Sequence, residues 1–212
     1  MKILTSWDDG HKLDLRIAKL LLKYKLRGIF FIPTIGCELS VDEIEKLSHN
    51  FEIGGHTTSH PSDIKKLSDE DAMYDIRDNK EWLEEIINND VQWFCYPRGR
   101  YNERTIEIIK DLGFLYARTT LVGNTDICEN DYRIHPSVHV AKNRKEYKEK
   151  PWLEFAVEQY KIAKNKENSY YHIWGHSWEI ESQNLWEELE ELFKYIYGDQ
   201  NNRSHNHTSK TE

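Results

Sequence analysis

The segments KILTSW (2–7), LDLRIAKLLLKYKL (13–26) and RGIFFIP (27–33) decide the fold class. The first and third are short and apolar, as buried strands are. Between them, apolar residues from Leu13 to Leu21 recur at the spacing of one helical face. A strand, a helix and a second strand in this order form a βαβ unit, in which the two strands run parallel.

The same alternation continues to the end of the chain. Further strands are expected at 51–56, 91–97, 114–120, 132–138 and 169–176. Further helices are expected at 41–49, 69–88, 102–112, 151–166 and 184–197. About seven parallel strands with helices outside them predict an α/β protein, a distorted (β/α) barrel that lacks one of the usual eight strands. We expect a single domain over 1–198 and a polar, disordered tail over 199–212.

Composition excludes several classes of function. The formal net charge is −8 and the Lys and Arg residues are scattered, so the chain lacks the basic stripe that binds nucleic acid. No stretch approaches about 18 uninterrupted apolar residues, so no membrane span is expected. The three cysteines form no CxxC motif and no signal peptide is apparent, which indicates reduced thiols and a cytoplasmic location.

The residues suited to catalysis follow the ends of the predicted strands. Asp8 and Asp9 follow the first strand. His56 and His60 follow the third, and His176 ends the last. In a β/α barrel these strand ends share one mouth. Two histidines four residues apart and a carboxylate from another strand form a three-ligand site with open positions, which is typical of a catalytic divalent metal.

Two adjacent aspartates suit two different roles. Successive side chains at a strand end point in different directions, so one carboxylate can bind the metal while the other accepts a proton from water. Near zinc the pKa of water falls to about 7. A histidine across the mouth can protonate a leaving amine, and the whole set therefore suits the hydrolysis of an amide.

These segments resemble the polysaccharide deacetylase, or NodB-homology, family of carbohydrate esterases. SWDDG (6–10) is similar to the first motif of that family, usually TFDDG. HTTSH (56–60) is similar to the second motif, H-[ST]-x-x-H. The resemblance extends to GHSWEIE (175–181) and so covers nearly the whole chain.

The resemblance implies a NodB-like barrel and assigns roles to individual residues. Asp8 corresponds to the general base of the family, and Asp9, His56 and His60 to its metal ligands. His176 corresponds to the general acid. The family binds one divalent metal ion, usually zinc, with cobalt or nickel as substitutes.

The third motif departs from the family pattern, R-x-P-[YF]-G. The corresponding segment is CYPRGRY (95–101), in which Cys95 occupies the place of the arginine that orients the base. The resemblance implies that the backbone N–H of Arg98 helps to hold an oxyanion, which places Arg98 in the catalytic group. Arg98 or Arg100 could replace the missing arginine, and either could instead bind substrate.

Three residues near the predicted mouth are candidates for contact with substrate: Arg100, Tyr101 and Trp178. The rings are included because amphipathic aromatic side chains suit the faces of pyranose sugars. His172 points to the same side of its strand as His176 and is predicted to be a packed core residue. The group that tunes His176 has three alternatives: Asp126, Arg133 and Glu179.

The sequence therefore predicts metal-dependent hydrolysis of an amide, most simply N-deacetylation of an N-acetylated sugar, oligosaccharide or polysaccharide. Relatives of this fold also open cyclic ureides and imides or remove formyl groups, so a small intracellular amide is an alternative substrate. An alternative of another class is a non-catalytic carbohydrate-binding module, which only the missing third-motif arginine favours. The exact substrate, the native metal and the oligomeric state are not predicted.

Overall fold

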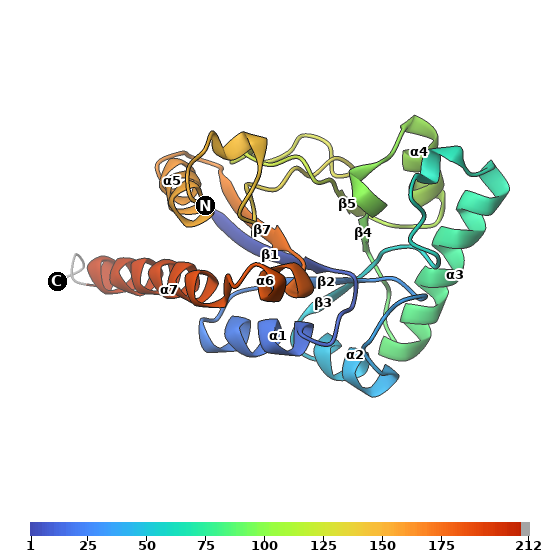
Figure 1. Ribbon diagram of the computed structural model, residues 1–212, viewed down its shortest axis with the longest axis horizontal. Coiled ribbons are helices and arrows are strands. Elements are labelled where there is room, and N and C mark those ends of the chain that lie inside the picture. Colours follow the sequence, from blue (N-terminus) through green and yellow to red (C-terminus); the bar gives the residue numbers. More distant parts are fainter. Residues whose placement is uncertain (209–212) are drawn as a thin grey trace.

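Seven parallel strands form one curved sheet with helices outside it, as Figure 1 shows for the computed structural model. The structure describes the backbone of residues 1–208 and the side chains of residues 1–201. The strand order is β5-β4-β3-β2-β1-β7-β6. The strands are β1 Lys2–Asp8, β2 Gly28–Ile32, β3 Glu52–Gly55, β4 Trp93–Cys95, β5 Tyr116–Arg118, β6 Val138–His139 and β7 Tyr170–Gly175. The predicted distorted barrel is confirmed.

Helices α1 to α5 lie between strands in the sequence, α6 and α7 follow the last strand, and the helices surround the sheet (Figure 1). They are α1 Asp14–Lys23, α2 Val41–Ser48, α3 Asp69–Ile87, α4 Glu103–Asp111, α5 Trp152–Lys164, α6 Ser177–Ser182 and α7 Trp186–Thr208. Ser40 and Glu43 form a capping box at the start of α2. The Ser68 hydroxyl accepts the backbone N–H of Asp71 at the start of α3. Both helix starts lie where the sequence predicts them, because these side chains satisfy N–H groups that a first turn leaves unpaired.

An irregular segment between β5 and β6 contacts both sides of the gap in the curved sheet. Ile134 forms a single parallel bridge with Arg118 of β5, and Ser137 donates its backbone N–H to the carbonyl of His172 in β7. The sequence predicts a strand over 132–138, but the strand β6 is confined to Val138–His139. Pro136 has no N–H and interrupts the ladder, which explains the difference.

The C-terminal part of the chain contains more helix than expected. The six residues of α6 follow β7 directly, where no helix is predicted. The helix expected over 184–197 is α7, which continues to Thr208 and so extends into the segment expected to be a disordered tail. Asp199 accepts hydrogen bonds from Tyr160 and Lys164 of α5, which holds the chain beyond Gly198 against the domain. Residues 209–212 of the expected tail lie outside the described residues.

Packing on both faces of the sheet positions the mouth. Most buried apolar residues, such as Trp7 and Phe30, form one cluster that includes the buried faces of the helices. A smaller cluster of Ile29, Phe31 and Cys95 forms separately. Side chains two residues apart on a strand share a face, so each strand alternates between these two environments.

Within the described part of the chain, no helix has the length and hydropathy of a membrane span.

Candidate active site

The three predicted metal ligands meet at the carboxyl ends of β1 and β3. Oδ1 of Asp9 lies 3.6 Å from Nε2 of His56 and 3.6 Å from Nε2 of His60. The two imidazole rings have centroids 4.8 Å apart. One ligand atom from each of the three residues falls within 4.8 Å of the others. Zinc binds such atoms at about 2.0–2.2 Å, so a single divalent ion could contact all three after small adjustments.

Unusual backbone conformations bring these ligands together. Asp9 has φ 82° and His60 has φ 47°, both in the left-handed region that non-glycine residues rarely adopt. The backbone N–H of His60 donates to Oγ1 of Thr57 at 3.0 Å. This bond closes the turn that returns His60 to the side of His56. Such strained positions are concentrated at functional sites in proteins.

His56 is oriented by groups behind it. Its Nδ1 lies 2.8 Å from the carbonyl oxygen of Cys95. A carbonyl only accepts, so Nδ1 carries a proton and Nε2 is the nitrogen that could bind a metal beside Asp9. The backbone N–H of His56 donates to Oδ1 of Asn79, a fully buried residue of α3. This support resembles the outer contacts that fix histidine ligands in metal sites.

The charges around the three ligands favour a cation. Burial raises the pKa of Asp9, but His56 and the other neighbours outweigh burial and hold it well below its usual value. Burial lowers the pKa of His56, but Cys95, Asp9 and Asp8 raise it well above the usual value. Burial lowers the pKa of His60, and the charge of His56 lowers it further. Asp9 is therefore a charged carboxylate, and the nitrogen and carboxylate donors of the site fit a divalent metal such as zinc.

Replacing a ligand should remove the metal. We expect the wild-type protein to hold close to one divalent ion per chain, and we expect His56→Ala and His60→Ala to hold much less, because each removes one of three ligands. Elemental analysis of dialysed protein measures this. His49→Ala is the matched control, since His49 lies exposed at the end of α2. Unchanged metal content in both ligand variants would contradict the assignment.

Asp8 is held by an arginine that the sequence analysis does not identify. Nη2 of Arg118 lies 2.5 Å from Oδ1 of Asp8 and also contacts Oδ2. Arg118 is fully buried, and Asp8 is 2% exposed. Cys95 lies beside the pair, with Sγ 2.8 Å from Nη2 of Arg118. A buried carboxylate is retained only with such a partner, so the pair fixes the position of Asp8.

Neither of the two predicted substitutes for the third-motif arginine contacts Asp8. Arg98 and Arg100 are exposed and follow β4. Arg100 donates to the carbonyl of Ser62 at 3.0 Å and lies 3.5 Å from Asp63, on the loop after His60. The suggestion that either side chain takes the place of the missing arginine is therefore wrong. Their predicted roles toward the oxyanion and the substrate remain predictions.

The register of the sheet explains why Arg118 can reach Asp8. Arg118 ends β5 and pairs with Cys95, the last residue of β4 and the first of the third motif. It therefore lies on the strand next to the one that carries the motif. The only signal in the sequence is an arginine inside an otherwise strand-like run, FLYARTT (114–120). That signal is informative only once the pairing of β4 with β5 is known.

Glu179 is the residue that contacts His176. Oε2 of Glu179 lies 3.1 Å from Nδ1 of His176, one turn earlier along the chain. The remaining candidates for a tuning residue lie elsewhere, since Asp126 pairs with Lys166 and Arg133 pairs with Glu103. His176 also lies near the metal ligands, with Nε2 3.9 Å from Oδ2 of Asp9.

The two predicted aromatic contacts differ in position. Trp178 is 42% exposed, donates Nε1–H to Oδ2 of Asp9 at 3.0 Å and has its ring 5.0 Å from that of His176, so it lies at the mouth. Tyr101 is half-buried and stacks on Tyr96 with centroids 4.4 Å apart. Its contact with substrate remains a prediction.

His172 is a core histidine, as predicted. It is fully buried, and its Nε2 lies 2.9 Å from the hydroxyl of Ser6 in β1. Burial lowers its pKa well below the usual value, so the ring is neutral at pH 7. It lies four residues before His176, deeper along β7.

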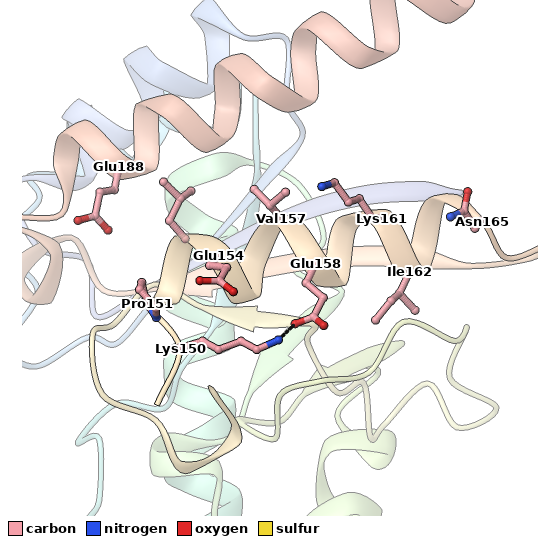
Figure 2. A pocket seen from close by; sticks show the side chains of 10 residues that line it. Lys150, Pro151, Glu154, Val157, Glu158, Lys161, Ile162, Asn165 and Glu188 are labelled. Atoms are coloured by element: carbon pink, nitrogen blue, oxygen red, sulfur yellow. Dashed lines mark hydrogen bonds and ion pairs between the residues drawn. The ribbon is translucent and has the colours of Figure 1, made fainter. Parts of the chain in front are cut away.

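A hollow on another side of the molecule lacks comparable chemistry. It has a volume of about 830 Å³ and follows the outer face of α5, as Figure 2 shows. Its apolar side chains are Pro151, Leu153, Val157 and Ile162, and Lys150 forms an ion pair with Glu158 at 2.7 Å. No histidine or cysteine lines it. The groups suited to hydrolysis gather instead at the mouth of the barrel.

Comparison with known proteins supports a family assignment. A curated relative is YxkH of Bacillus subtilis (strain 168), provisionally named a polysaccharide deacetylase. It is 24% identical over 139 residues, which are 63% of this chain and 50% of that protein. The chain thus spans about half the length of this curated relative.

Solved structures share the fold at low sequence identity. The Streptococcus pyogenes deacetylase PplD, in complex with acetate, has a TM-score of 0.57 at 21% identity, with 62% of each chain covered. BA3943 of Bacillus anthracis, a pseudoenzyme of carbohydrate esterase family 4, has a TM-score of 0.64 at 16% identity over 94% of this chain and 61% of that one. A family 4 carbohydrate esterase from Streptomyces lividans, in complex with acetate, has a TM-score of 0.63 at 11% identity over 92% of this chain and 89% of that one.

The model of the polysaccharide deacetylase family matches residues 2–117, more than half of the chain. This match includes the strand ends that carry Asp8, Asp9, His56 and His60. It agrees with the seven-stranded barrel and with the resemblance of the first two motifs. The chain belongs to the polysaccharide deacetylase family.

Proposed function

We propose that the protein is a metal-dependent deacetylase that hydrolyses the N-acetyl group of an amino sugar, oligosaccharide or polysaccharide. The observation that carries the proposal is the meeting of two carboxylates and three histidines at one barrel mouth. Asp9, His56 and His60 have the donor set of a divalent metal, and Asp8 and His176 border it. Family membership supports carbohydrate deacetylation as the reaction.

Asp9, His56 and His60 are the residues that would hold the metal. When bound, a divalent cation supplies Lewis acidity and lowers the pKa of water in the site. The chain itself fixes the ligands, since Cys95 orients His56 and Thr57 closes the turn to His60. This preorganisation keeps the site in one arrangement before substrate binds.

Asp8 is proposed as the general base. Its carboxylate oxygen, a ring nitrogen of His56 and Sγ of Cys95 fall within 4.8 Å of one another, so Asp8 borders the metal ligands. Arg118 keeps the carboxylate in place, and a positioned carboxylate can accept a proton from the attacking water. Asp8 and Asp9 thus divide the work, one as a proton acceptor and one as a ligand.

The backbone N–H of Arg98 is proposed as a donor to the oxyanion. Arg98 has φ 56° and ψ 17°, a left-handed conformation inside the turn Pro97–Gly99 that follows β4. Among the described residues its N–H has no hydrogen-bond partner. A backbone donor without a partner suits a group that develops negative charge during the reaction. This role depends on the backbone, so replacing the Arg98 side chain should matter little.

His176 is proposed as the general acid. Glu179 accepts from Nδ1–H, so Nε2 is the nitrogen that can gain and lose a proton toward the mouth. The imidazolium form would donate that proton to the leaving amine of the amide. Trp178 lies beside His176, where its ring could pack against a sugar ring of the substrate.

Removing His176 should affect poor leaving groups most. We expect His176→Ala to lower the deacetylation of N-acetylglucosamine oligomers more than the hydrolysis of nitrophenyl acetate, by a ratio of roughly tenfold or more. A leaving amine needs a proton, whereas a nitrophenolate hardly does. Rates on both substrates, together with metal content, measure the effect.

Different roles for His176 predict different results. If it only packs at the mouth, both rates should fall equally and stability should decrease. If it binds metal, the metal content should fall. Turnover of N-acetyl oligosaccharides by the wild type tests the proposed function itself. Hydrolysis of cyclic imides, ureides or formamides alone would favour a small amide substrate, and metal binding without any turnover would favour a pseudoenzyme.

A further inference from the structure

Glu179 contacts two histidines, and the proposed function uses only one of them. Oε2 of Glu179 lies 3.1 Å from Nδ1 of His176 and 3.0 Å from Nε2 of His139. His139 ends β6, the edge strand beside β7. Glu179 also receives Nε2–H of Gln183 on its other oxygen at 3.0 Å. The carboxylate therefore accepts hydrogen bonds from His176 and Gln183 and lies beside Nε2 of His139.

His139 is rigidly held. It is 5% exposed, and its ring stacks on Trp174 with centroids 3.9 Å apart and an interplanar angle of 10°. Nη1 of Arg144 lies 3.3 Å from Nδ1 of His139. Arg144 is itself fixed, because it donates to the carbonyl of Thr120 at 3.0 Å and pairs with Glu146 at 3.2 Å.

The partner on each nitrogen determines the tautomer of His139. A guanidinium has donors only, so Nδ1 of His139 must accept from Arg144. The proton of the neutral ring then lies on Nε2, the nitrogen that faces Glu179. Nε2 of His139 lies 3.0 Å from the carboxylate of Glu179, although its N–H is not aligned for a hydrogen bond. A metal bound at this nitrogen would need the opposite tautomer, which Arg144 disfavours.

We propose that His139 is a positioning residue, an inference that rests on the proposed function. Arg144 holds His139 as the Nε2–H tautomer, and His139 in turn directs the carboxylate of Glu179 toward His176. The contacts run from Arg144, in the loop after β6, through His139 and Glu179 to His176 at the mouth. Arg144 donates to Nδ1 of His139, and Oε2 of Glu179 lies 3.0 Å from Nε2 of His139 and 3.1 Å from Nδ1 of His176. The last group, His176, is thereby fixed with Nδ1–H on Glu179 and with Nε2 toward Asp9.

The charges agree with this division of roles. Burial lowers the pKa of His139 to about 4, so the ring stays neutral and acts as a donor without competing for a proton. Burial raises the pKa of Glu179, but the nearby rings of His139 and His176 outweigh burial and bring it to about 2. The carboxylate is therefore charged and can stabilise an imidazolium at His176.

The tautomer can be measured directly. In a long-range proton–nitrogen NMR spectrum of the whole protein, we expect His139 as a neutral ring protonated on Nε2. Arg144→Met should shift the ring toward the Nδ1–H form, because the donor to Nδ1 is lost. Glu146→Gln is the matched control, since it changes the other partner of Arg144 and leaves the contact with His139. A wild-type His139 protonated on Nδ1 would overturn the proposal.

Kinetic variants test the effect on His176. His139→Phe keeps a ring to stack on Trp174 but cannot donate to Glu179, and we expect it to lower amide hydrolysis about tenfold more than nitrophenyl acetate hydrolysis. His139→Gln restores an N–H donor and should recover most of that loss. Metal content should stay unchanged in both, since His139 is not among the three proposed metal ligands. Equal losses on both substrates, or no recovery with Gln, would reduce His139 to a packing residue.

Failure of the proposed function would look different. A wild type without deacetylase activity on any N-acetyl sugar would contradict the reaction. In that case the NMR spectrum still decides whether Arg144 sets the tautomer of His139. An active wild type whose His139 variants behave normally would contradict only the positioning role.

Discussion

Asp8→Asn should lower the turnover of N-acetylated sugars by roughly 10²–10⁴, the usual contribution of a positioned proton acceptor. An amide has almost the shape of a carboxylate, but it does not accept a proton at neutral pH. Asp8 is not among the three proposed metal ligands, so the metal content should stay near one ion per chain. Rates and elemental analysis of the same preparation measure both quantities.

The neighbouring aspartate is the matched control for this prediction. Asp9→Asn weakens a ligand and should lose metal, whereas Asp8→Asn should keep it. The opposite pattern would mean that the two roles are reversed. Asp8→Asn also leaves the buried guanidinium of Arg118 facing a neutral group, and breaking a buried pair costs about 3–5 kcal/mol. Thermal unfolding of the variant shows how much of the effect is a loss of folded protein.

The sequence predicts the part of the site that depends on strand ends. Asp8 and Asp9 follow β1, and His56 follows β3, in segments whose strand character is clear from their apolar runs. The β/α alternation then places all of them at one mouth, whatever the details of each strand. His60 joins them because a short turn after β3 fixes its distance from His56. Strand order and spacing along the chain are therefore enough to bring these residues together.

The residues that the sequence does not assign depend on sheet register and helix position. Arg118 reaches Asp8 only because β5 pairs with β4 so that it lies opposite Cys95, and β5 has three residues with no motif. Glu179 is one of three candidates in the sequence, because no local pattern predicts the short helix α6 that places it one turn after His176. His139 is brought to Glu179 by the pairing of β6 with β7. Register is set by the hydrophobic pattern of a strand, and β5 and β6, with three and two residues, are too short to carry one.

Replacing Arg118 should inactivate the protein, and moving the arginine to position 95 should restore the activity. Arg118→Cys leaves the carboxylate of Asp8 buried without the cation that holds it in place, so the base should be lost. We expect turnover to fall roughly as far as in Asp8→Asn, by about 10²–10⁴. Stability should fall as well, because a buried charge loses its partner.

A double variant separates loss of the base from loss of folding. Cys95 lies opposite Arg118, with Sγ 3.6 Å from Oδ2 of Asp8, so an arginine at position 95 starts beside the same carboxylate. Cys95→Arg combined with Arg118→Cys keeps the same side chains and places the arginine where the family motif has it. We expect this double variant to recover most of the turnover that Arg118→Cys loses, an interaction that a double-mutant cycle measures. Arg77→Ala is the control and should stay within about threefold of wild type, since Arg77 pairs with Asp78 and Glu81 on the surface of α3, away from the site. If Arg118→Cys is folded and fully active, Asp8 does not need this arginine, and the buried pair serves only the stability of the barrel.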